Sequence, residues 1–365
     1  MTAIADLPTP ALLLDIGRLE SNLERMAARA RALGVALRPH VKTHKCIEVA
    51  RLQRSLGATG ITVSTLHEAA AFADHGFDDI TWASPVCLPH VTEATELASR
   101  VMLRVVVDSP DAVARLRETG HPFSTWLDVD CGYHRTGVDP EGELAVSLAR
   151  DIHDSPKLHF DGILTHSGHA YHARGRDAVR RVAEEERAVM VKFAGRLRGE
   201  GGLEVSRVSV GSTPAASLVE CLDGITEMRP GNYALYDFTQ VTIGSCEARD
   251  CALTVLATVV SSQPGSGHCV VDAGALALSK DPGPKDLPRA TMGEIFENYA
   301  AGTLNPNVRV VAVSQEHGIV NGRLPVGSQV RILPNHACLA VALHDRFHAV
   351  REDRVVDSWK IWRGR

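Results

Sequence analysis

The chain has 365 residues, 44% of them apolar, and a formal net charge of −5 at pH 7. It is longer than one average domain and apolar enough for a full core, so two globular domains are expected. Because acidic and basic residues are interspersed along the chain, no surface for nucleic acid or for an anionic membrane is predicted, and small-molecule chemistry is favoured.

Short apolar runs alternate with longer amphipathic segments from about residue 11 to residue 240, which is the pattern of repeated βα units on a parallel sheet. Strand-like runs lie at residues 11–14, 35–42, 60–64, 79–83, 102–107, 125–130, 160–166 and 205–210. Helical patterns lie between most of them, including 16–33, 65–75 and 174–198. About eight strands predict a TIM-like (β/α)8 barrel, which typically needs about 250 residues, with a doubly wound open sheet as the alternative.

The pattern changes after Tyr236. Apolar runs at residues 253–260, 269–272, 308–314, 329–332 and 347–350 alternate with turns and lack long helices between them. This pattern predicts a second, mostly antiparallel β-domain. We therefore expect an α/β barrel domain at residues 11–240 and a β-domain formed by residues 241–365 together with residues 1–10.

Targeting signals and disulfides are not expected. No run of about 18 apolar residues occurs, and residues 1–6 lack the regions of a secretion signal, so the prediction is a cytoplasmic protein. The eight cysteines are scattered without a CxxC pair, which favours thiols over disulfides.

A lysine closes the second strand-like run. If residues 35–42 are extended, Lys42 shares a face with His40 and Arg38 near the barrel mouth, where barrel enzymes carry reactive groups. The ordinary interpretation is a solvated cluster, because lysine is rarely buried. Neighbouring cations, however, disfavour the ammonium form and give a neutral amine that can react with an aldehyde.

The segment around Lys42 resembles the cofactor-lysine motif of fold-type III enzymes of pyridoxal 5′-phosphate (PLP), specifically the D-serine dehydratase and D-threonine aldolase group. Further segments resemble this group in the same order, at residues 130–137, 166–171, 211–214, 230–233, 272–274, 315–318 and 334–338. The resemblance implies the alanine-racemase-like fold, with a PLP-binding barrel followed by a β-domain. It also implies that Lys42 is catalytic and holds PLP, and that the protein is a homodimer.

The same resemblance implies a set of cofactor-binding residues. Gly211, Ser212 and Thr213 follow a strand and precede a helical segment, a position that suits a phosphate, although an ordinary helix N-cap is the simpler interpretation. Gly231, Asn232 and Tyr233 would complete the phosphate cradle, and Tyr171 would lie near the ring or the phosphate. Arg135 matches the arginine that faces the ring nitrogen. Since arginine stays charged, PLP held this way is a weaker electron sink, and help for a leaving group becomes useful.

His336 and Cys338 are a candidate metal site. Two residues apart in an extended strand, they would fall on one face and could bind one ion. Such a pair alone is weak, but with Pro334 and Asn335 before it the segment resembles the zinc pair of D-serine dehydratases. D-threonine aldolases carry His-x-Asp there, and a thiolate favours zinc over manganese or magnesium.

The resemblance therefore implies a PLP- and zinc-dependent D-serine dehydratase that releases pyruvate and ammonia. Lys42 would take the α-proton while zinc assists the departing β-hydroxyl. The alternatives are an aldolase acting on D-threonine or 3-hydroxy-D-aspartate, and a D-threo-3-hydroxyaspartate dehydratase, which needs a site for one more carboxylate. A non-catalytic PLP carrier is disfavoured, because related carriers lack the β-domain.

Two sets of charged residues, one on a strand and one on a helix, are given no catalytic role. Asp128 and Asp130 share a face of one strand-like run, where a salt bridge with the basic cluster is favoured over a carboxylate pair. The helix predicted at residues 174–198 is interpreted as a solvated, arginine-rich face that includes Glu184, Glu185 and Glu186.

Overall fold

The computed structural model describes residues 2–284 and 287–364. The chain forms two compact units, which we call the barrel unit and the β unit. The barrel unit contains Met26–Lys42, Ala50–Gly231 and Gly364–Arg365, and the β unit contains Met1–Arg25, Thr43–Val49 and Asn232–Arg363. No helix in the described part of the chain is both long enough and apolar enough to cross a membrane.

A parallel sheet forms the centre of the barrel unit. Among the described residues its strands are β2 (Ala36–Leu37), β3 (Ile61–Val63), β4 (Asp79–Pro85), β5 (Met102–Val107), β6 (Phe123–Asp128), β7 (Leu158–Leu164), β8 (Val208–Val210) and β9 (Glu227–Met228). Their order is β2-β9-β8-β7-β6-β5-β4-β3, and a parallel bridge between His40 and Thr62 connects the two ends of this order. The predicted TIM-like barrel is confirmed.

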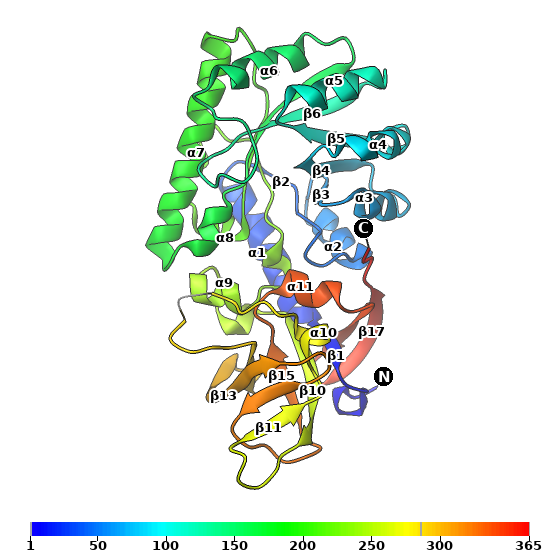
Figure 1. Ribbon diagram of the computed structural model, residues 1–365, viewed down its shortest axis with the longest axis vertical. Helices are drawn as coiled ribbons and strands as arrows, with labels where there is room; N and C mark the ends of the chain where they lie inside the picture. Colours follow the sequence, from blue (N-terminus) through cyan, green and yellow to red (C-terminus); the bar gives the residue numbers. More distant parts are fainter. Residues whose placement is uncertain (1, 285–286, 365) are drawn as a thin grey trace. The chain divides into compact units, whose positions relative to one another are not determined.

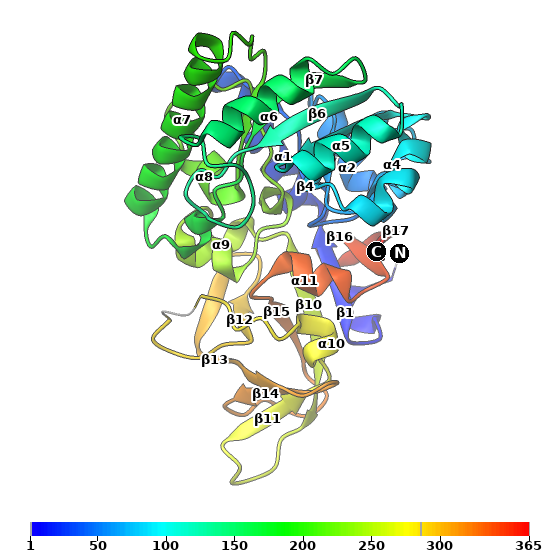
Figure 2. The same ribbon diagram turned by 45° about the horizontal axis from the view of Figure 1, so that its top comes forward.

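Helices follow the strands of the barrel unit in the βα alternation. They are α2 (Ile47–Ser55), which begins in the β unit, α3 (Leu66–Ala73), α4 (Val91–Ala98), α5 (Pro110–Glu118), α6 (Glu143–His153), α7 (Arg176–Gly199) and α8 (Thr213–Leu218), with the short 3-10 helices η2 (Leu88–His90) and η3 (Gly168–His172). Figures 1 and 2 show α4, α5, α6 and α7 along the outer side of the strands. Buried apolar side chains such as Val113, Leu116, Leu148 and Phe193 fix these helices to the sheet.

A second sheet forms the β unit. Among the described residues its strands are β1 (Ala11–Asp15), β10 (Leu253–Ser261), β11 (His268–Val271), β12 (Gly293–Asn298), β13 (Thr303–Val313), β14 (Gly318–Asn321), β15 (Gln329–Leu333), β16 (Arg346–Arg351) and β17 (Arg354–Lys360). Neighbouring strands are antiparallel except β1 and β16. The mostly antiparallel β-domain is thus confirmed.

Short helices also belong to the β unit. They are η1 (Ile4–Asp6), η4 (Asn232–Ala234), α9 (Phe238–Ile243), η5 (Ala248–Asp250), α10 (Ala275–Leu278) and α11 (Ala337–Ala342), while α1 (Ile16–Ala32) begins in this unit and ends in the barrel unit. Helices α10 and α11 contact each other. Helix α11 follows β15, and this connection carries the predicted metal ligands.

Two strand predictions are wrong in detail, and one strand was missed. The run at residues 11–14 is a strand, but β1 pairs with β10 and β16 in the β unit rather than with the barrel. The eighth barrel strand is instead β9, which has two residues. The extended run at residues 35–42 is also shorter than predicted, because β2 ends at Leu37 and residues 41–44 form a turn.

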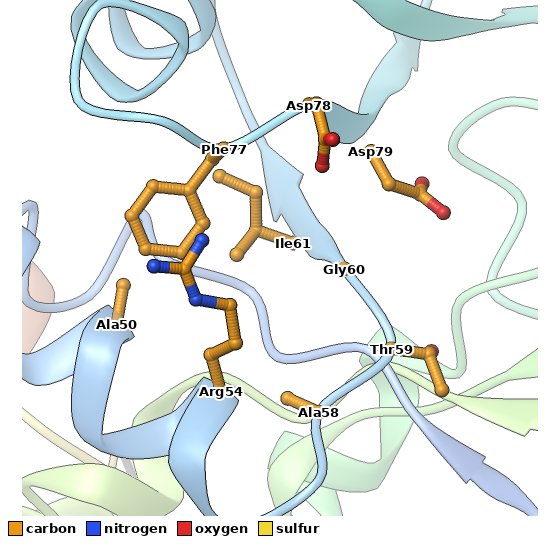
Figure 3. Close-up of a pocket in the computed structure, with 9 residues that line it drawn as sticks. All are labelled: Ala50, Arg54, Ala58, Thr59, Gly60, Ile61, Phe77, Asp78 and Asp79. Atoms are coloured by element: carbon orange, nitrogen blue, oxygen red, sulfur yellow. The ribbon is translucent and has the colours of Figure 1, made fainter.

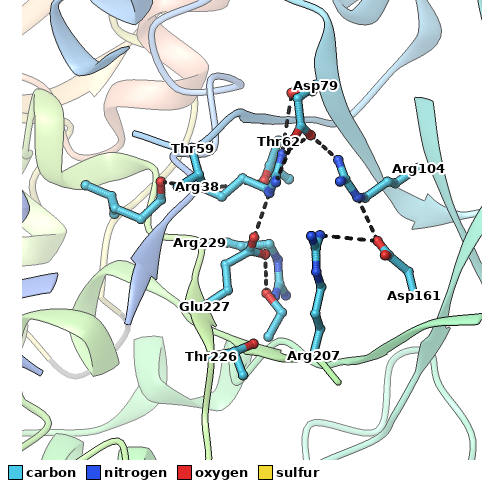
Figure 4. Close-up of polar contacts among 12 residues, drawn as sticks. Arg38, Thr59, Thr62, Asp79, Arg104, Asp161, Arg207, Thr226, Glu227 and Arg229 are labelled. Atoms are coloured by element: carbon cyan, nitrogen blue, oxygen red, sulfur yellow. Dashed lines mark hydrogen bonds and ion pairs between the residues drawn. The ribbon is translucent and has the colours of Figure 1, made fainter. Parts of the chain in front are cut away.

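Ion pairs fill part of the barrel interior (Figure 4). Arg38 is 2% exposed and pairs with Asp79 at 2.5 Å and with Glu227 at 2.7 Å. Arg104 contacts the same Asp79 and pairs with Asp161 at 2.7 Å. Arg38 therefore does not join a basic face with Lys42. Its charge is neutralised inside the barrel, because a buried guanidinium needs acidic partners.

A pocket lies at the amino-terminal ends of β3 and β4 (Figure 3). Arg54 covers the ring of Phe77 there, with the guanidinium carbon 4.6 Å from the ring centroid, and Ile61, Asp78 and Asp79 also line the pocket. Barrel enzymes place their reactive groups at the opposite, carboxyl ends of the strands. This pocket is therefore not the candidate site.

Candidate functional site

Lys42 lies in the turn after the His40 bridge and is half-buried. His166 follows the carboxyl end of β7 in the same unit. Burial lowers the pKa of His166 to about 3, and the positive charge of Lys42 acts in the same direction. The imidazole is therefore neutral near pH 7, and the charge of Lys42 acts on an uncharged histidine in this part of the barrel mouth.

The neutral imidazole of His166 has a fixed tautomer. Its Nδ1 lies 2.9 Å from the carbonyl oxygen of Gly211, and because a carbonyl only accepts, Nδ1 carries the proton. Gly211 has φ of +133°, and a Cβ at this position would lie 2.8 Å from the backbone nitrogen of Arg229. Only glycine fits there, so the loop after β8 is held close to the end of β9.

Ser212 and Thr213 are buried at the start of α8. Ser212 Oγ accepts a hydrogen bond from Ala215 N at 3.3 Å, so the ordinary N-cap interpretation applies to this serine. The same hydroxyl lies 3.4 Å from Ser167 Oγ, which belongs to the loop after β7. Hydroxyl groups from two neighbouring loops thus meet in the interior of the barrel unit.

Arg135 is exposed in the loop between β6 and α6. Its guanidinium lies 5.2 Å from the centroid of the Tyr133 ring, and Tyr133 in turn contacts the ring of His166 edge-on. The charge of Arg135 also helps to lower the pKa of His166. Arg135 therefore lies near Tyr133 and His166, but its side chain is exposed and not enclosed as contact with a buried cofactor ring would require.

The carboxylates predicted as neighbours have different partners. Asp130 Oδ1 accepts from Gly132 N and His134 N at 2.9 Å each, so Asp130 holds the loop that carries Arg135. Asp128 is 6% exposed, and burial followed by the nearby charge of Asp108 raises its pKa to about 6. The close carboxylate of Asp128 is thus Asp108 rather than Asp130.

The remaining predicted cofactor residues fall in both units. Tyr171 lies in η3 and Gly231 follows β9 in the barrel unit, whereas Asn232 and Tyr233 lie in η4 of the β unit. Tyr233 is fully buried. Asn232 is 4% exposed, and its Oδ1 is buried without a hydrogen-bond partner among the described residues.

Asp237 joins the segment of Asn232 to the segment of the predicted metal ligands within the β unit. Its Oδ2 accepts from Asn232 Nδ2 at 2.6 Å and from Ala337 N at 2.8 Å, and its Oδ1 accepts from Gln240 N at 2.9 Å. Burial raises the pKa of Asp237, whereas these hydrogen bonds stabilise its carboxylate. Sequence reasoning did not identify this aspartate.

The side chains of His336 and Cys338 lie together, although not on a strand as predicted. His336 is the N-cap of α11 and Cys338 is in its first turn. Asp281 Oδ2 lies 2.9 Å from His336 Nδ1. Burial opposes protonation of His336, but the Cys338 sulfur and the Asp281 carboxylate raise its pKa to about 11. The Cys338 sulfur and the Asp281 carboxylate therefore favour a positive charge at the His336 ring.

Thr43 is a further neighbour of this sulfur, with Thr43 Oγ1 3.2 Å from Cys338 Sγ in the β unit. No cluster of three or more histidine, cysteine, aspartate or glutamate ligands is found within residues 2–284 and 287–364. A metal held by His336 and Cys338 alone would have two protein ligands and coordination positions open for other ligands.

Comparisons with known proteins agree with this architecture. The protein-family model of the alanine racemase N-terminal domain matches residues 14–237. The family model described as a putative serine dehydratase domain matches residues 252–350. The chain is 39% identical to D-threo-3-hydroxyaspartate dehydratase of Delftia sp. (strain HT23), with 97% of each chain covered. The chain belongs to this family of fold-type III PLP enzymes.

Other members of the family include a D-serine dehydratase of Dictyostelium discoideum, which is 34% identical with 98% of this chain and 97% of the relative covered. A D-threonine aldolase of Arthrobacter sp. is 31% identical with 98% and 93% covered. The solved structure of the Delftia dehydratase superposes with a TM-score of 0.94 at 37% identity and covers all of both chains. The chain is accordingly a PLP-dependent lyase, as the resemblance predicted.

Proposed function

We propose that this lyase is a PLP- and zinc-dependent dehydratase that converts D-serine to pyruvate and ammonia. The observation that carries the proposal is the pairing of His336 with Cys338 at the start of α11, oriented by Asp281 at 2.9 Å. By the sequence resemblance, the cysteine is shared with D-serine dehydratases, whereas D-threonine aldolases carry aspartate there. Elimination of a hydroxyl is therefore favoured over cleavage of a carbon-carbon bond.

The residues of the barrel mouth fit PLP. An aldehyde needs an amine, which Lys42 supplies, and a phosphate needs donors, which Ser212 and Thr213 supply at a loop where Gly211 permits close packing. In the β unit, Oδ1 of Asn232 is buried without a hydrogen-bond partner among the described residues, which supports a role in binding a ligand. When bound, PLP would serve as the electron sink for loss of the α-proton.

Lys42 would hold and release the α-proton at Nζ. The neutral His166, whose Nδ1 proton is engaged by Gly211, adds no positive charge beside this amine. Arg135 is proposed to face the ring nitrogen side of the site, and Tyr171, Gly231 and Tyr233 to complete the enclosure. These groups bind and orient the substrate while Lys42 moves the proton.

His336 and Cys338 would hold the metal. His336 would lose its proton when zinc binds, and the resulting neutral imidazole and the Cys338 thiolate are ligands that zinc prefers. Asp281 would fix the ring so that Nε2 is the ligating atom. A structure of the related Delftia dehydratase, in a cysteine-to-alanine variant, is described as the metal-free form, which supports a metal in that relative. When bound, zinc would act as a Lewis acid on the β-hydroxyl.

A second candidate substrate is D-threo-3-hydroxyaspartate, favoured by the 39% identity to the dehydratase of that name. The purified protein, loaded with PLP and zinc, is incubated with D-serine, D-threonine and the 3-hydroxyaspartate isomers. Keto acid and ammonia from D-serine are expected, and they should disappear after chelation. Glycine as the product would contradict the proposal, and keto acid only from 3-hydroxyaspartate would establish the second candidate.

A further inference from the structure

The third of three consecutive glutamates in α7 is buried. Glu184 and Glu185 are exposed, whereas Glu186 is 2% exposed, so the prediction of a solvated face is wrong for this residue. Because the helix advances about 100° per residue, Glu186 falls on the side of α7 that faces the barrel. A buried carboxylate costs free energy unless hydrogen bonds compensate.

The compensation comes from two loops of the barrel mouth. Oε1 of Glu186 accepts from Ser167 N at 3.1 Å and from Gly211 N at 3.1 Å. Ser167 follows β7 and Gly211 follows β8, so one carboxylate oxygen fixes the distance between the loops after two adjacent strands. The backbone N–H of Gly211 is therefore engaged inside the protein.

The same two loops make two more contacts. His166 Nδ1 donates to Gly211 O at 2.9 Å, and the hydroxyls of Ser167 and Ser212 are 3.4 Å apart. Both backbone polar groups of Gly211 are thus fixed by groups outside its own strand. A small pocket beside the carboxylate is lined by Glu186, Gly211, Ala183, Ala215 and Met228. Loss of the carboxylate would enlarge this pocket and release both loops.

We propose that Glu186 is a positioning residue that sets the geometry of the loops after β7 and β8 for the phosphate group of PLP. The inference rests on the proposed function, because these loops matter to the cofactor only if they hold its phosphate. Glu186 reaches the ligand through the backbone of Ser167 and Gly211, and so it acts on phosphate recognition without taking part in the chemistry at Lys42.

The test compares binding of PLP with binding of pyridoxal, which has the same aldehyde but no phosphate. Dissociation constants for both are measured from the absorbance change when each aldehyde attaches to the apoprotein. For Glu186→Ala the dissociation constant of PLP divided by that of pyridoxal should rise at least about tenfold, since two buried amides lose their acceptor. Glu186→Gln keeps an oxygen that can accept both bonds and should stay within about threefold of the original ratio.

Two control variants separate positioning from stability. Glu68→Ala removes another buried helix carboxylate, which accepts from Ser64 N at 2.7 Å after β3, and Glu185→Ala removes an exposed neighbour on α7. Glu68→Ala should lower the thermal unfolding midpoint without changing the PLP to pyridoxal ratio. Glu185→Ala should change neither quantity.

The outcomes also separate this inference from the proposed function. An unchanged ratio in Glu186→Ala, or equal loss of affinity for PLP and pyridoxal, would overturn the role of Glu186 and leave the dehydratase proposal standing. If the unmodified protein bound PLP no better than pyridoxal, or did not bind PLP, the phosphate cradle itself would be wrong. Both proposals would then fall.

Discussion

The carboxylate of Asp281 lies 2.9 Å from Nδ1 of His336, on the ring nitrogen that would not bind the metal. Asn335, the residue before His336, donates through its Nδ2 to the backbone oxygen of Asp281 at 2.9 Å. Two consecutive residues therefore fix the segment of Asp281 against the start of α11. An imidazole oriented in this way is a better ligand, because its tautomer and ring angle are set in advance.

Replacing Asp281 by alanine should weaken metal binding about 10- to 100-fold, which is the usual effect of removing a carboxylate that orients a ligating histidine. Competition with a chelating dye measures the affinity. Glu297→Ala, an exposed carboxylate of the same unit, is the matched control and should leave the affinity unchanged. Equal affinities in the two variants would contradict the assignment of His336 as a ligand.

Cys338→Asp should change which metal the protein prefers. A thiolate is a soft ligand that suits zinc, whereas a carboxylate suits manganese and magnesium. The variant should lose affinity for zinc and gain relative affinity for manganese, measured by metal content after dialysis against equal mixtures. If zinc were still retained to the same extent, the sulfur would not be a ligand.

Asp128 should make stability depend on pH. Burial raises the pKa of Asp128 to about 6, whereas in the unfolded chain the carboxyl has its ordinary value near 4. Between these values the folded protein keeps a proton that the unfolded chain loses, so the free energy of unfolding falls as pH rises through this window. The loss amounts to at most about 3 kcal/mol.

An asparagine at position 128 cannot lose a proton in this range. The Asp128→Asn variant should therefore gain stability relative to the unmodified protein between pH 4 and pH 7. Its free energy of unfolding minus that of the unmodified protein should be larger at pH 7 than at pH 4. Urea titrations at the two pH values measure this difference. A difference that is independent of pH would show that Asp128 titrates in the folded protein as it does in the unfolded chain.

Gly168 and Tyr133 should be coupled. A Cβ on Gly168 would overlap atoms of the Tyr133 ring, which Arg135 and His166 also contact. Gly168→Ala should destabilise the fold by about 1–3 kcal/mol and lower activity, because the rigid ring has to move. In a double-mutant cycle, Tyr133→Ala should remove most of that cost. Additive effects would mean that the loop relaxes without moving the ring.

Much of the fold could be predicted because strand and helix periodicities are local. Residues 102–107 are β5 as predicted, and the antiparallel runs after residue 252 are strands. The assignment of β1 failed because its apolar residues 11–14 suit either sheet, and only pairing with β10 and β16 decides. Strand β9 was missed because two residues, one of them the charged Glu227, carry no periodic signal.

The residues of the candidate site could be predicted only where they belong to a recognisable sequence motif. His336 and Cys338 were identified, although the expected strand is the start of a helix. Three acidic residues that support the site, Asp237, Asp281 and Glu186, make side-chain hydrogen bonds to partners at least 19 positions away in the sequence. Asp237 and Asp281 also accept hydrogen bonds from nearby residues, namely Gln240, Asn232 and Gly283. The distant partners follow from tertiary packing, so isolated acidic residues in the sequence gave no signal for them.

The account depends most directly on Lys42. The PLP-loaded protein is reduced with borohydride, digested and mapped by mass spectrometry, with Lys45→Ala as the matched control in the same segment. The account predicts a reduced phosphopyridoxyl group on Lys42, retained in Lys45→Ala and lost in Lys42→Ala. Label on another lysine, or none at all in protein that turns over D-serine, would contradict it.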